Sequence, residues 1–181
     1  MIVGFTGFKG CGKDTAAAFA PYVKIYKFAD PLKAMLGTFL KFHGYTTDDI
    51  WECLEGDLKE DTIDPFLGQT SRWAMQSLGT EWGRQLIHPD VWLHTMETRL
   101  AAKKDREVIA VTDVRFLNEA KLIYKMGGKL IRISRPGNDP DPTKALHPSE
   151  SEMRNIIPSV TIVNDGTVED LRKKVTSYLK V

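Results

Sequence analysis

Cysteine is scarce in this chain of 181 residues, and no long apolar run is present. Cys11 and Cys53 have no cysteine or histidine partner at metal-ligand spacing, and two thiols argue against a disulfide framework. No stretch approaches the roughly 20 apolar residues that span a bilayer. The N-terminal MIVGFTG also lacks the basic and apolar regions of a signal peptide. We therefore expect a protein of a reducing cytoplasm.

A large net charge is also missing. The 25 basic residues nearly balance the 24 acidic ones, which leaves a formal net charge of +1 at pH 7. We therefore expect no membrane binding and no direct nucleic-acid binding, although a local basic pocket is compatible with this balance. With 42% hydrophobic and 27% charged residues, the composition is typical of a globular protein. The length suits one domain, or one core with an inserted subdomain.

Strand-like and helix-like segments alternate along most of the chain, which predicts a parallel sheet with helices on both faces. Residues 41–98 contain no strand-like run and predict a helical insertion. The expected strands are residues 1–6, 23–28, 107–114, 129–135 and 159–165. The expected helices are residues 15–20, 30–40 with Asp30 as N-cap, 71–87, 91–104, 118–128 and 167–179.

The segment GFKGCGKDT, residues 7–15, is close to the phosphate-binding pattern G-x-x-x-x-G-K-[ST]. Asp14 stands where the hydroxyl is expected, and Thr15 supplies a hydroxyl one residue later. Small residues let the backbone wrap around phosphate oxygens, and Lys13 adds a positive charge. A glycine-rich turn without a ligand is the alternative, but the spacing and the strand-loop-helix context disfavour it. No N-K-x-D motif is present, which argues against a GTPase.

Five segments in this order resemble the deoxynucleoside monophosphate kinases of tailed bacteriophages, members of the P-loop nucleoside monophosphate kinase superfamily. They are GFKGCGKDT, KFADPLK, SRWAMQSLGTEWGR, DVW and VTDVRFLNEA. The resemblance covers about residues 2–120 and continues more loosely through HPSE to the C-terminus. In this family Asp followed by Thr commonly comes after the P-loop lysine. Cys11 departs from the serine that relatives often carry.

The resemblance implies an α/β P-loop kinase fold in a single domain, residues 1–181. It implies a helical NMP-binding insertion at about residues 41–98, and we expect a lid-like loop at about 135–152. The implied reaction transfers the γ-phosphate of ATP to a dNMP, giving a dNDP for phage DNA synthesis in the host cytoplasm. Mg²⁺ is the implied cofactor, nucleotides are the implied partners, and a homodimer is left open.

The resemblance and the chemistry of the side chains together predict the site. The predicted catalytic residues are Lys13, Arg72, Asp113 and Arg115. ATP is expected at Gly10, Cys11, Gly12, Lys13, Asp14 and Thr15, with Mg²⁺ near Thr15 or Asp14. The predicted substrate-binding residues are Lys9, Arg72, Gly79, Thr80, Arg84, Trp92, Asp113, Arg115 and Glu119.

The predicted insertion offers phosphate-binding and base-binding groups. The guanidinium groups of Arg72 and Arg84 suit a phosphate, although either could lie on a solvated face. Gly79-Thr80 is expected to break a helix and bring backbone and a hydroxyl close to the nucleotide. Trp92 offers a flat face for a base. Core packing is the alternative for Trp92, and we expect it for Trp51, Trp73 and Trp82.

The third expected strand places Asp113 at its carboxyl end, where ligands bind in open α/β sheets. Asp113 could hold Mg²⁺ through water or accept a hydrogen bond from the acceptor nucleotide. Arg115 and Glu119 follow within one helical turn, and a plain salt bridge is their alternative. Further along, Arg132, Arg135 and Lys144 are candidate lid cations. His147 and Glu150 match a family-like segment to which the sequence assigns no role.

Two other functions fit the same motifs. Phosphomevalonate kinase and dephospho-coenzyme A kinase share parts of the GKDT and FADPLK patterns, although a base platform at Trp92 favours a nucleotide. A P-loop module that binds ATP without kinase activity is the third reading, and it would lack an acceptor site.

Overall fold

The structure is a computed structural model that describes residues 1–20, 23–104, 107–138 and 151–180. The chain divides into two compact units, which are treated separately below. Unit 1 comprises Met1–Phe28 and Met96–Val181, and unit 2 comprises Ala29–Thr95. The boundary falls inside helix α5 (Val91–Ala101).

Unit 1 contains a five-stranded sheet with the strand order β2-β3-β1-β4-β5, in which all neighbours are parallel. The strands are β1 (Ile2–Thr6), β2 (Val23–Tyr26), β3 (Val108–Val111), β4 (Lys129–Ser134) and β5 (Val160–Val163). The five predicted strands are therefore confirmed. The third ends at Val111, so Asp113 lies in the loop that follows the strand.

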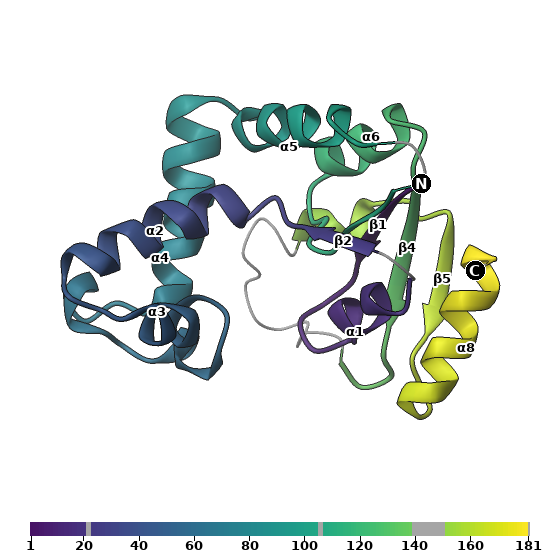
Figure 1. Cartoon of the computed structure of the whole chain (residues 1–181), viewed down its shortest axis with the longest axis horizontal. Coiled ribbons are helices and arrows are strands. Elements are labelled where there is room, and N and C mark those ends of the chain that lie inside the picture. Colours follow the sequence, from purple (N-terminus) through teal and green to yellow (C-terminus); the bar gives the residue numbers. More distant parts are fainter. Residues whose placement is uncertain (21–22, 105–106, 139–150, 181) are drawn as a thin grey trace. The chain divides into compact units, whose positions relative to one another are not determined.

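Helices cover both faces of this sheet, as predicted (Figure 1). On one face, α1 (Lys13–Ala18) and α8 (Val168–Leu179) pack on a core that includes Phe5 and Ile133. Helix α6 (Leu117–Lys125) packs on β1 and β4 at the other face, where Ile123 is fully buried. The β1–α1 loop leaves the carboxyl end of a central strand, which is the edge where α/β sheets bind ligands.

Unit 2 is helical. Its elements are α2 (Asp30–Phe42), α3 (Thr47–Leu54), the 3₁₀ turns η1 (Asp57–Glu60) and η2 (Asp64–Phe66), α4 (Ser71–Ser77), the π-helix η3 (Leu78–Ile87) and the first turn of α5. They enclose a small core around Leu40, Cys53 and Leu54. Helix α2 begins with Asp30 in its first turn and Ala29 as N-cap, so the prediction of Asp30 as N-cap is wrong by one residue.

Two predictions about unit 2 are wrong. Gly79 and Thr80 do not break the helix, because the chain continues without interruption from α4 into the π-helix η3. Three tryptophans expected in the core are exposed instead: Trp51, Trp73 and Trp82 expose 57%, 52% and 39% of their surface. Trp92, at 5%, is the buried one.

Across the described residues, no helix is both long and apolar enough to cross a membrane. Cys11 and Cys53 are buried free thiols. Histidine, cysteine, aspartate and glutamate side chains form no group of three that could share a metal ion within the described ranges.

Candidate functional site

The loop between β1 and α1 adopts a conformation that requires glycine. Gly7, Gly10 and Gly12 have φ angles of 139°, 79° and 99°, which L side chains rarely adopt. A Cβ atom on Gly7 would lie 2.2 Å from the carbonyl oxygen of Ile133, and one on Gly12 would lie 2.7 Å from Nδ2 of Asn164. The loop therefore approaches strand β4 and the β5–α8 loop too closely for any side chain at these positions.

Two asparagine side chains hold this loop by hydrogen bonds to its backbone. Nδ2 of Asn138 donates to the Lys9 carbonyl at 2.6 Å, and Nδ2 of Asn164 donates to the Cys11 carbonyl at 3.0 Å. These two bonds satisfy carbonyl groups of the loop and leave its N–H groups unaffected. Within the described ranges, the N–H groups of Gly10, Gly12 and Lys13 have no hydrogen-bond acceptor.

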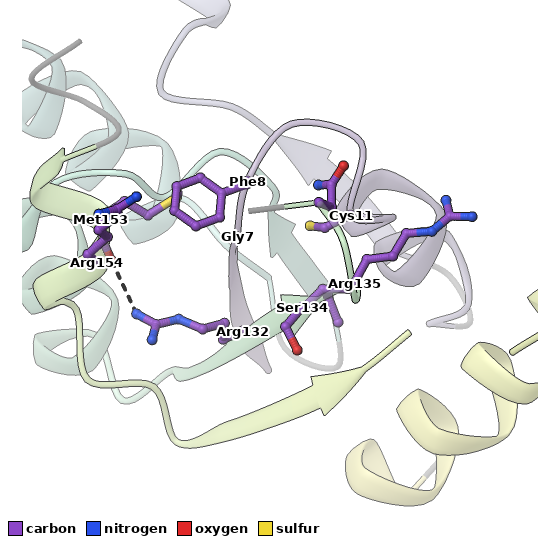
Figure 2. A pocket seen from close by; sticks show the side chains of 10 residues that line it. Gly7, Phe8, Cys11, Arg132, Ser134, Arg135, Met153 and Arg154 are labelled. Atoms are coloured by element: carbon purple, nitrogen blue, oxygen red, sulfur yellow. Dashed lines mark hydrogen bonds between the residues drawn. The ribbon is translucent and has the colours of Figure 1, made fainter. Parts of the chain in front are cut away.

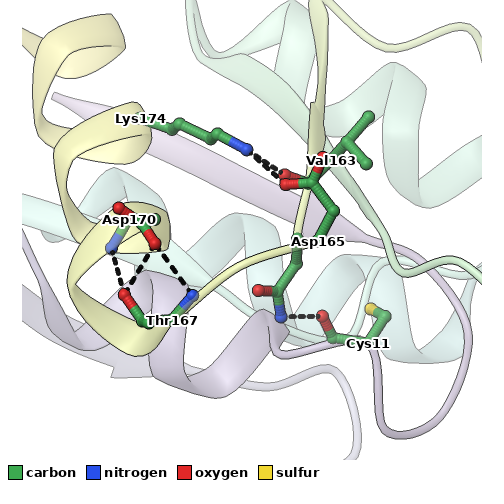
Figure 3. A network of polar contacts seen from close by, with 7 residues as sticks. Cys11, Val163, Asp165, Thr167, Asp170 and Lys174 are labelled. Atoms are coloured by element: carbon green, nitrogen blue, oxygen red, sulfur yellow. Dashed lines mark hydrogen bonds and ion pairs between the residues drawn. The ribbon is translucent and has the colours of Figure 1, made fainter.

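The β5–α8 loop that carries Asn164 is itself restrained (Figure 3). Lys174 donates to the Val163 carbonyl at 2.8 Å and to Oδ1 of Asp165 at 2.7 Å. One turn further on, the Thr167 hydroxyl and the Asp170 carboxylate cap the start of α8. Asn164 is therefore held in place to support the glycine loop.

Lys13 folds back onto its own loop. Its ammonium group donates to the Phe8 carbonyl at 2.8 Å and lies 3.7 Å from Sγ of Cys11. Burial lowers the pKa of Lys13, with the positive charge of Arg115 acting in the same direction and Cys11 and Asp14 acting against it.

A pocket of about 360 Å³ opens beside the loop. Five of the six residues predicted for ATP line it, and Cys11 lines a neighbouring cavity instead. Asp14 and Thr15 are exposed at this pocket. The volume falls in the usual range for small-molecule sites. The pocket is lined by Gly10, Gly12, Lys13, Asp14, Thr15, Arg135, Asn164, Gly166, Val168 and Leu171.

The loop after β3 and the first turn of α6 carry three more predicted residues. Oδ1 of Asp113 accepts a hydrogen bond from the Phe28 backbone N–H at 2.8 Å. Glu119, only 2% exposed, accepts from the backbone N–H groups of Arg115 and Phe116 at 2.7 and 3.1 Å. Its carboxylate therefore caps the start of α6. Among described residues, nothing accepts a hydrogen bond from the Arg115 guanidinium.

Two buried hydroxyls adjoin predicted site residues in the sequence. Thr6 ends β1 just before the glycine loop, and Thr112 comes just before Asp113. The side-chain oxygens of both are buried and have no hydrogen-bond partner in the described part of the chain. Buried hydroxyls are normally bonded, so these two are available to a water molecule or a ligand.

In unit 2, backbone and side-chain contacts hold most of the predicted acceptor residues. The indole N–H of Trp92 donates to the Gly79 carbonyl at 2.8 Å, and Thr80 is buried next to it in the sequence. Nη1 of Arg84 donates to the Pro89 carbonyl at 2.9 Å. Arg72 forms an ion pair with Glu60 through its Nε atom. The buried Trp92 thus stabilises the π-helix through this hydrogen bond. Stacking of a base on Trp92 stays a prediction.

Some predicted residues lie outside the described residues, and two residues that support the loop were not predicted. Lys144, His147 and Glu150 fall outside the described residues, as does most of the expected lid at 135–152. Sequence reasoning missed Asn138 and Asn164. A signal for Asn164 existed, because a polar residue at the carboxyl end of a strand faces the ligand edge of a parallel sheet.

Comparison with known proteins gives a consistent result. Residues 57–175 match the family model of deoxynucleotide monophosphate kinase. A protein of Acanthamoeba polyphaga mimivirus that carries this family's name is 33% identical over 98% of this chain and 95% of its own length. The deoxynucleoside-5′-monophosphate kinase of Escherichia phage T5 is 40% identical over 44% of this chain and 33% of its own length.

Among solved structures, shikimate kinase from Aquifex aeolicus aligns with 99% of this chain and 96% of its own, with 14% identity and a TM-score of 0.48. This degree of likeness says nothing about the substrate.

Proposed function

Because this chain belongs to the deoxynucleotide monophosphate kinase family, we propose that it transfers the γ-phosphoryl group of ATP to a deoxynucleoside 5′-monophosphate. The observation that carries the proposal is the glycine loop with Lys13 beside the pocket of about 360 Å³. The family match favours a deoxynucleotide over phosphomevalonate or dephospho-coenzyme A as the acceptor.

The pocket beside the loop is the proposed ATP site. The free N–H groups of Gly10, Gly12 and Lys13 are suited to phosphate oxygens, which accept hydrogen bonds from such backbone nests. The Lys13 ammonium donates to the Phe8 carbonyl, and its remaining N–H donors are suited to a phosphate oxygen. Hydrogen bonds between an ammonium and a charged phosphate are stronger than those between neutral groups.

Mg²⁺ fits the oxygen groups at this edge of the sheet. Asp14 and Thr15 present exposed oxygens at the pocket, and the buried hydroxyl of Thr112, next to Asp113, lacks a partner among described residues. Carboxylate, hydroxyl and water oxygens are the ligands that Mg²⁺ prefers. We propose that Asp14 or Thr15 holds the ion. Bound Mg²⁺ would neutralise charge on the phosphate oxygens.

For the acceptor we propose the predicted residues, within a single kinase domain whose helical insertion binds the monophosphate. Arg72 and Arg115 are proposed to hold the acceptor phosphate and the developing charge. The remaining proposed acceptor contacts are Lys9, Gly79, Thr80, Arg84, Trp92, Asp113 and Glu119.

The reaction needs alignment and charge neutralisation more than covalent catalysis. An oxygen of the acceptor 5′-phosphate bonds to the γ-phosphorus. The bond from that phosphorus to the β,γ-bridging oxygen breaks, and its electron pair stays on ADP. Lys13 and Arg115 are proposed to balance the charge. No enzyme-bound phosphoryl intermediate is expected.

An acceptor panel tests this function. The purified protein is assayed for ADP release with ATP, Mg²⁺ and, in turn, each dNMP, phosphomevalonate and dephospho-coenzyme A. At least one dNMP should support turnover, and Lys13→Ala should abolish it without changing the melting temperature. Turnover with phosphomevalonate or dephospho-coenzyme A, and with no dNMP, would overturn the proposal.

A further inference from the structure

A second cavity, of about 170 Å³, also lies beside the glycine loop. Figure 2 shows Phe8 and Arg154 side by side at this cavity, with Arg135 extending away past Cys11. Arg135 is the lining residue that the two cavities share. The rest of the second cavity is lined by the glycine loop, by β4, by Asn138 after β4 and by the 3₁₀ turn η4 (Glu152–Asn155).

The turn η4 is held firmly although it is short. Nη2 of Arg132, on β4, donates to the carbonyls of Met153 and Ile156 at 3.1 and 2.6 Å. Oε1 of Glu152 accepts from the backbone N–H of Leu117 at 3.0 Å, at the start of α6. Met153 is also buried. A 3₁₀ turn has few hydrogen bonds of its own, so these contacts fix the backbone from which Arg154 projects.

Arg154 lies directly over a residue of the glycine loop. Its Cζ atom is 5.7 Å from the centroid of the Phe8 ring. The carbonyl of that same Phe8 accepts the hydrogen bond from Nζ of Lys13. Two cations, Lys13 and Arg154, therefore flank Phe8, one at its carbonyl and one over its ring.

The restraint on Arg154 is weak. A cation–π contact at an exposed position contributes little, and Arg154 is exposed. In the described part of the chain no carboxylate pairs with its guanidinium. An arginine with a fixed backbone, a loosely held head group and no paired anion is suited to bind a phosphate when one arrives.

We propose that Arg154 is a further catalytic residue, whose guanidinium binds the phosphoryl group that is transferred beside Lys13. The inference rests on the proposed kinase function. Arg154 donates N–H bonds to the non-bridging oxygens of the phosphoryl group while the acceptor oxygen bonds to phosphorus and ADP departs. It keeps all its protons, so the step needs no further reactant. Arginines that stabilise this charge contribute about 10³–10⁵-fold to the rate in related chemistry.

The test compares Arg154→Ala and Arg154→Lys with the matched control Arg172→Ala. Arg172 lies on α8 and pairs with Glu169 at 3.6 Å, with 60% of its side chain exposed. Arg154→Ala should lower kcat about 10³-fold or more, while the KM for ATP and the melting temperature change little. Arg172→Ala should leave kcat unchanged. Arg154→Lys should keep part of the activity, and added guanidinium ion should restore part of the activity of Arg154→Ala.

Three results would overturn the inference: a kcat of Arg154→Ala within twofold of wild type, an equal loss in Arg172→Ala, or a loss explained by a lower melting temperature. Failure of the proposed function is seen separately, because the wild-type protein would then release no ADP with any dNMP.

Discussion

Replacing Trp92 by phenylalanine should lower the free energy of unfolding, because a hydrogen bond within unit 2 is lost. The indole N–H donates to the Gly79 carbonyl at 2.8 Å, and only 5% of Trp92 is exposed. Gly79 is only partly buried and its carbonyl lies within the π-helix, so the expected cost is that of one lost hydrogen bond, about 0.5–1.5 kcal/mol. For a chain of this size, that corresponds to a fall in melting temperature of about 1–6 °C.

The same indole explains why position 83 is glycine. A Cβ atom there would lie 2.6 Å from Cζ2, 2.7 Å from Nε1 and 2.8 Å from Cε2 of Trp92. Gly83→Ala should therefore destabilise by about 1–3 kcal/mol through overpacking. A phenylalanine ring does not reach the Cζ2 position, so the added methyl group is less crowded in the double variant Trp92→Phe/Gly83→Ala. The double variant should lose less free energy of unfolding than the sum of the two single losses, by about 0.5–3 kcal/mol.

Urea unfolding followed by circular dichroism measures this double-mutant cycle. Trp51→Phe is the matched control, because Trp51 is 57% exposed in the same unit. It should change the free energy of unfolding by less than about 0.5 kcal/mol. Single losses that add to within about 0.3 kcal/mol would show that the indole and Gly83 are not in contact, and would refute this reasoning.

Three further outcomes are expected. Asn164→Ala removes the hydrogen bond to the Cys11 carbonyl and should raise the KM for ATP several-fold at unchanged acceptor KM; an unchanged ATP KM would contradict a supporting role. Asp14→Ser restores the common loop and should raise the Mg²⁺ concentration needed for half-maximal rate, whereas unchanged kinetics for metal and both substrates would exclude a role for the carboxylate. Hydrogen bonds from threonine caps lower the pKa of Asp49 and Asp170, so each stabilises the fold above the unfolded value of about 3.9 and ceases to do so as pH falls through the lowered pKa. Asp49→Asn and Asp170→Asn should therefore lose less stability than the wild-type protein when the pH is lowered. An equal loss would refute the claim that these carboxylates stabilise the fold.

The sequence predicted the parts of the fold that depend on local patterns. Glycines at positions 7, 10 and 12 follow an apolar strand, and all three have the positive φ angles that a phosphate-binding turn requires. Alternating strand and helix segments also predicted five parallel strands with helices on both faces. Both features rest on backbone sterics and hydrophobic periodicity, which a single sequence displays.

The sequence did not show features that depend on contacts between distant residues. The indole N–H of Trp92 donates a hydrogen bond to the carbonyl of Gly79 in the π-helix η3, 13 residues earlier in the chain. Helix propensity does not predict such a bond. The prediction that Trp73 and Trp82 lie in the core failed for the same reason, because both are exposed despite their apolar rings. The contact between Arg154 and Phe8 likewise depends on the tertiary structure. The two residues are 146 positions apart in the chain, and β4 and η4 bring Arg154 over the Phe8 ring.

The central claim is that this chain is a kinase for deoxynucleoside monophosphates whose glycine loop and Lys13 hold ATP. The most direct measurement separates and quantifies the nucleotides after incubation with ATP, Mg²⁺ and a dNMP. We predict that dNDP and ADP form in equal amounts, and that Lys13→Ala forms neither while its melting temperature stays unchanged. Release of ADP without dNDP, or dNDP formation by Lys13→Ala at a rate near wild type, would contradict the account.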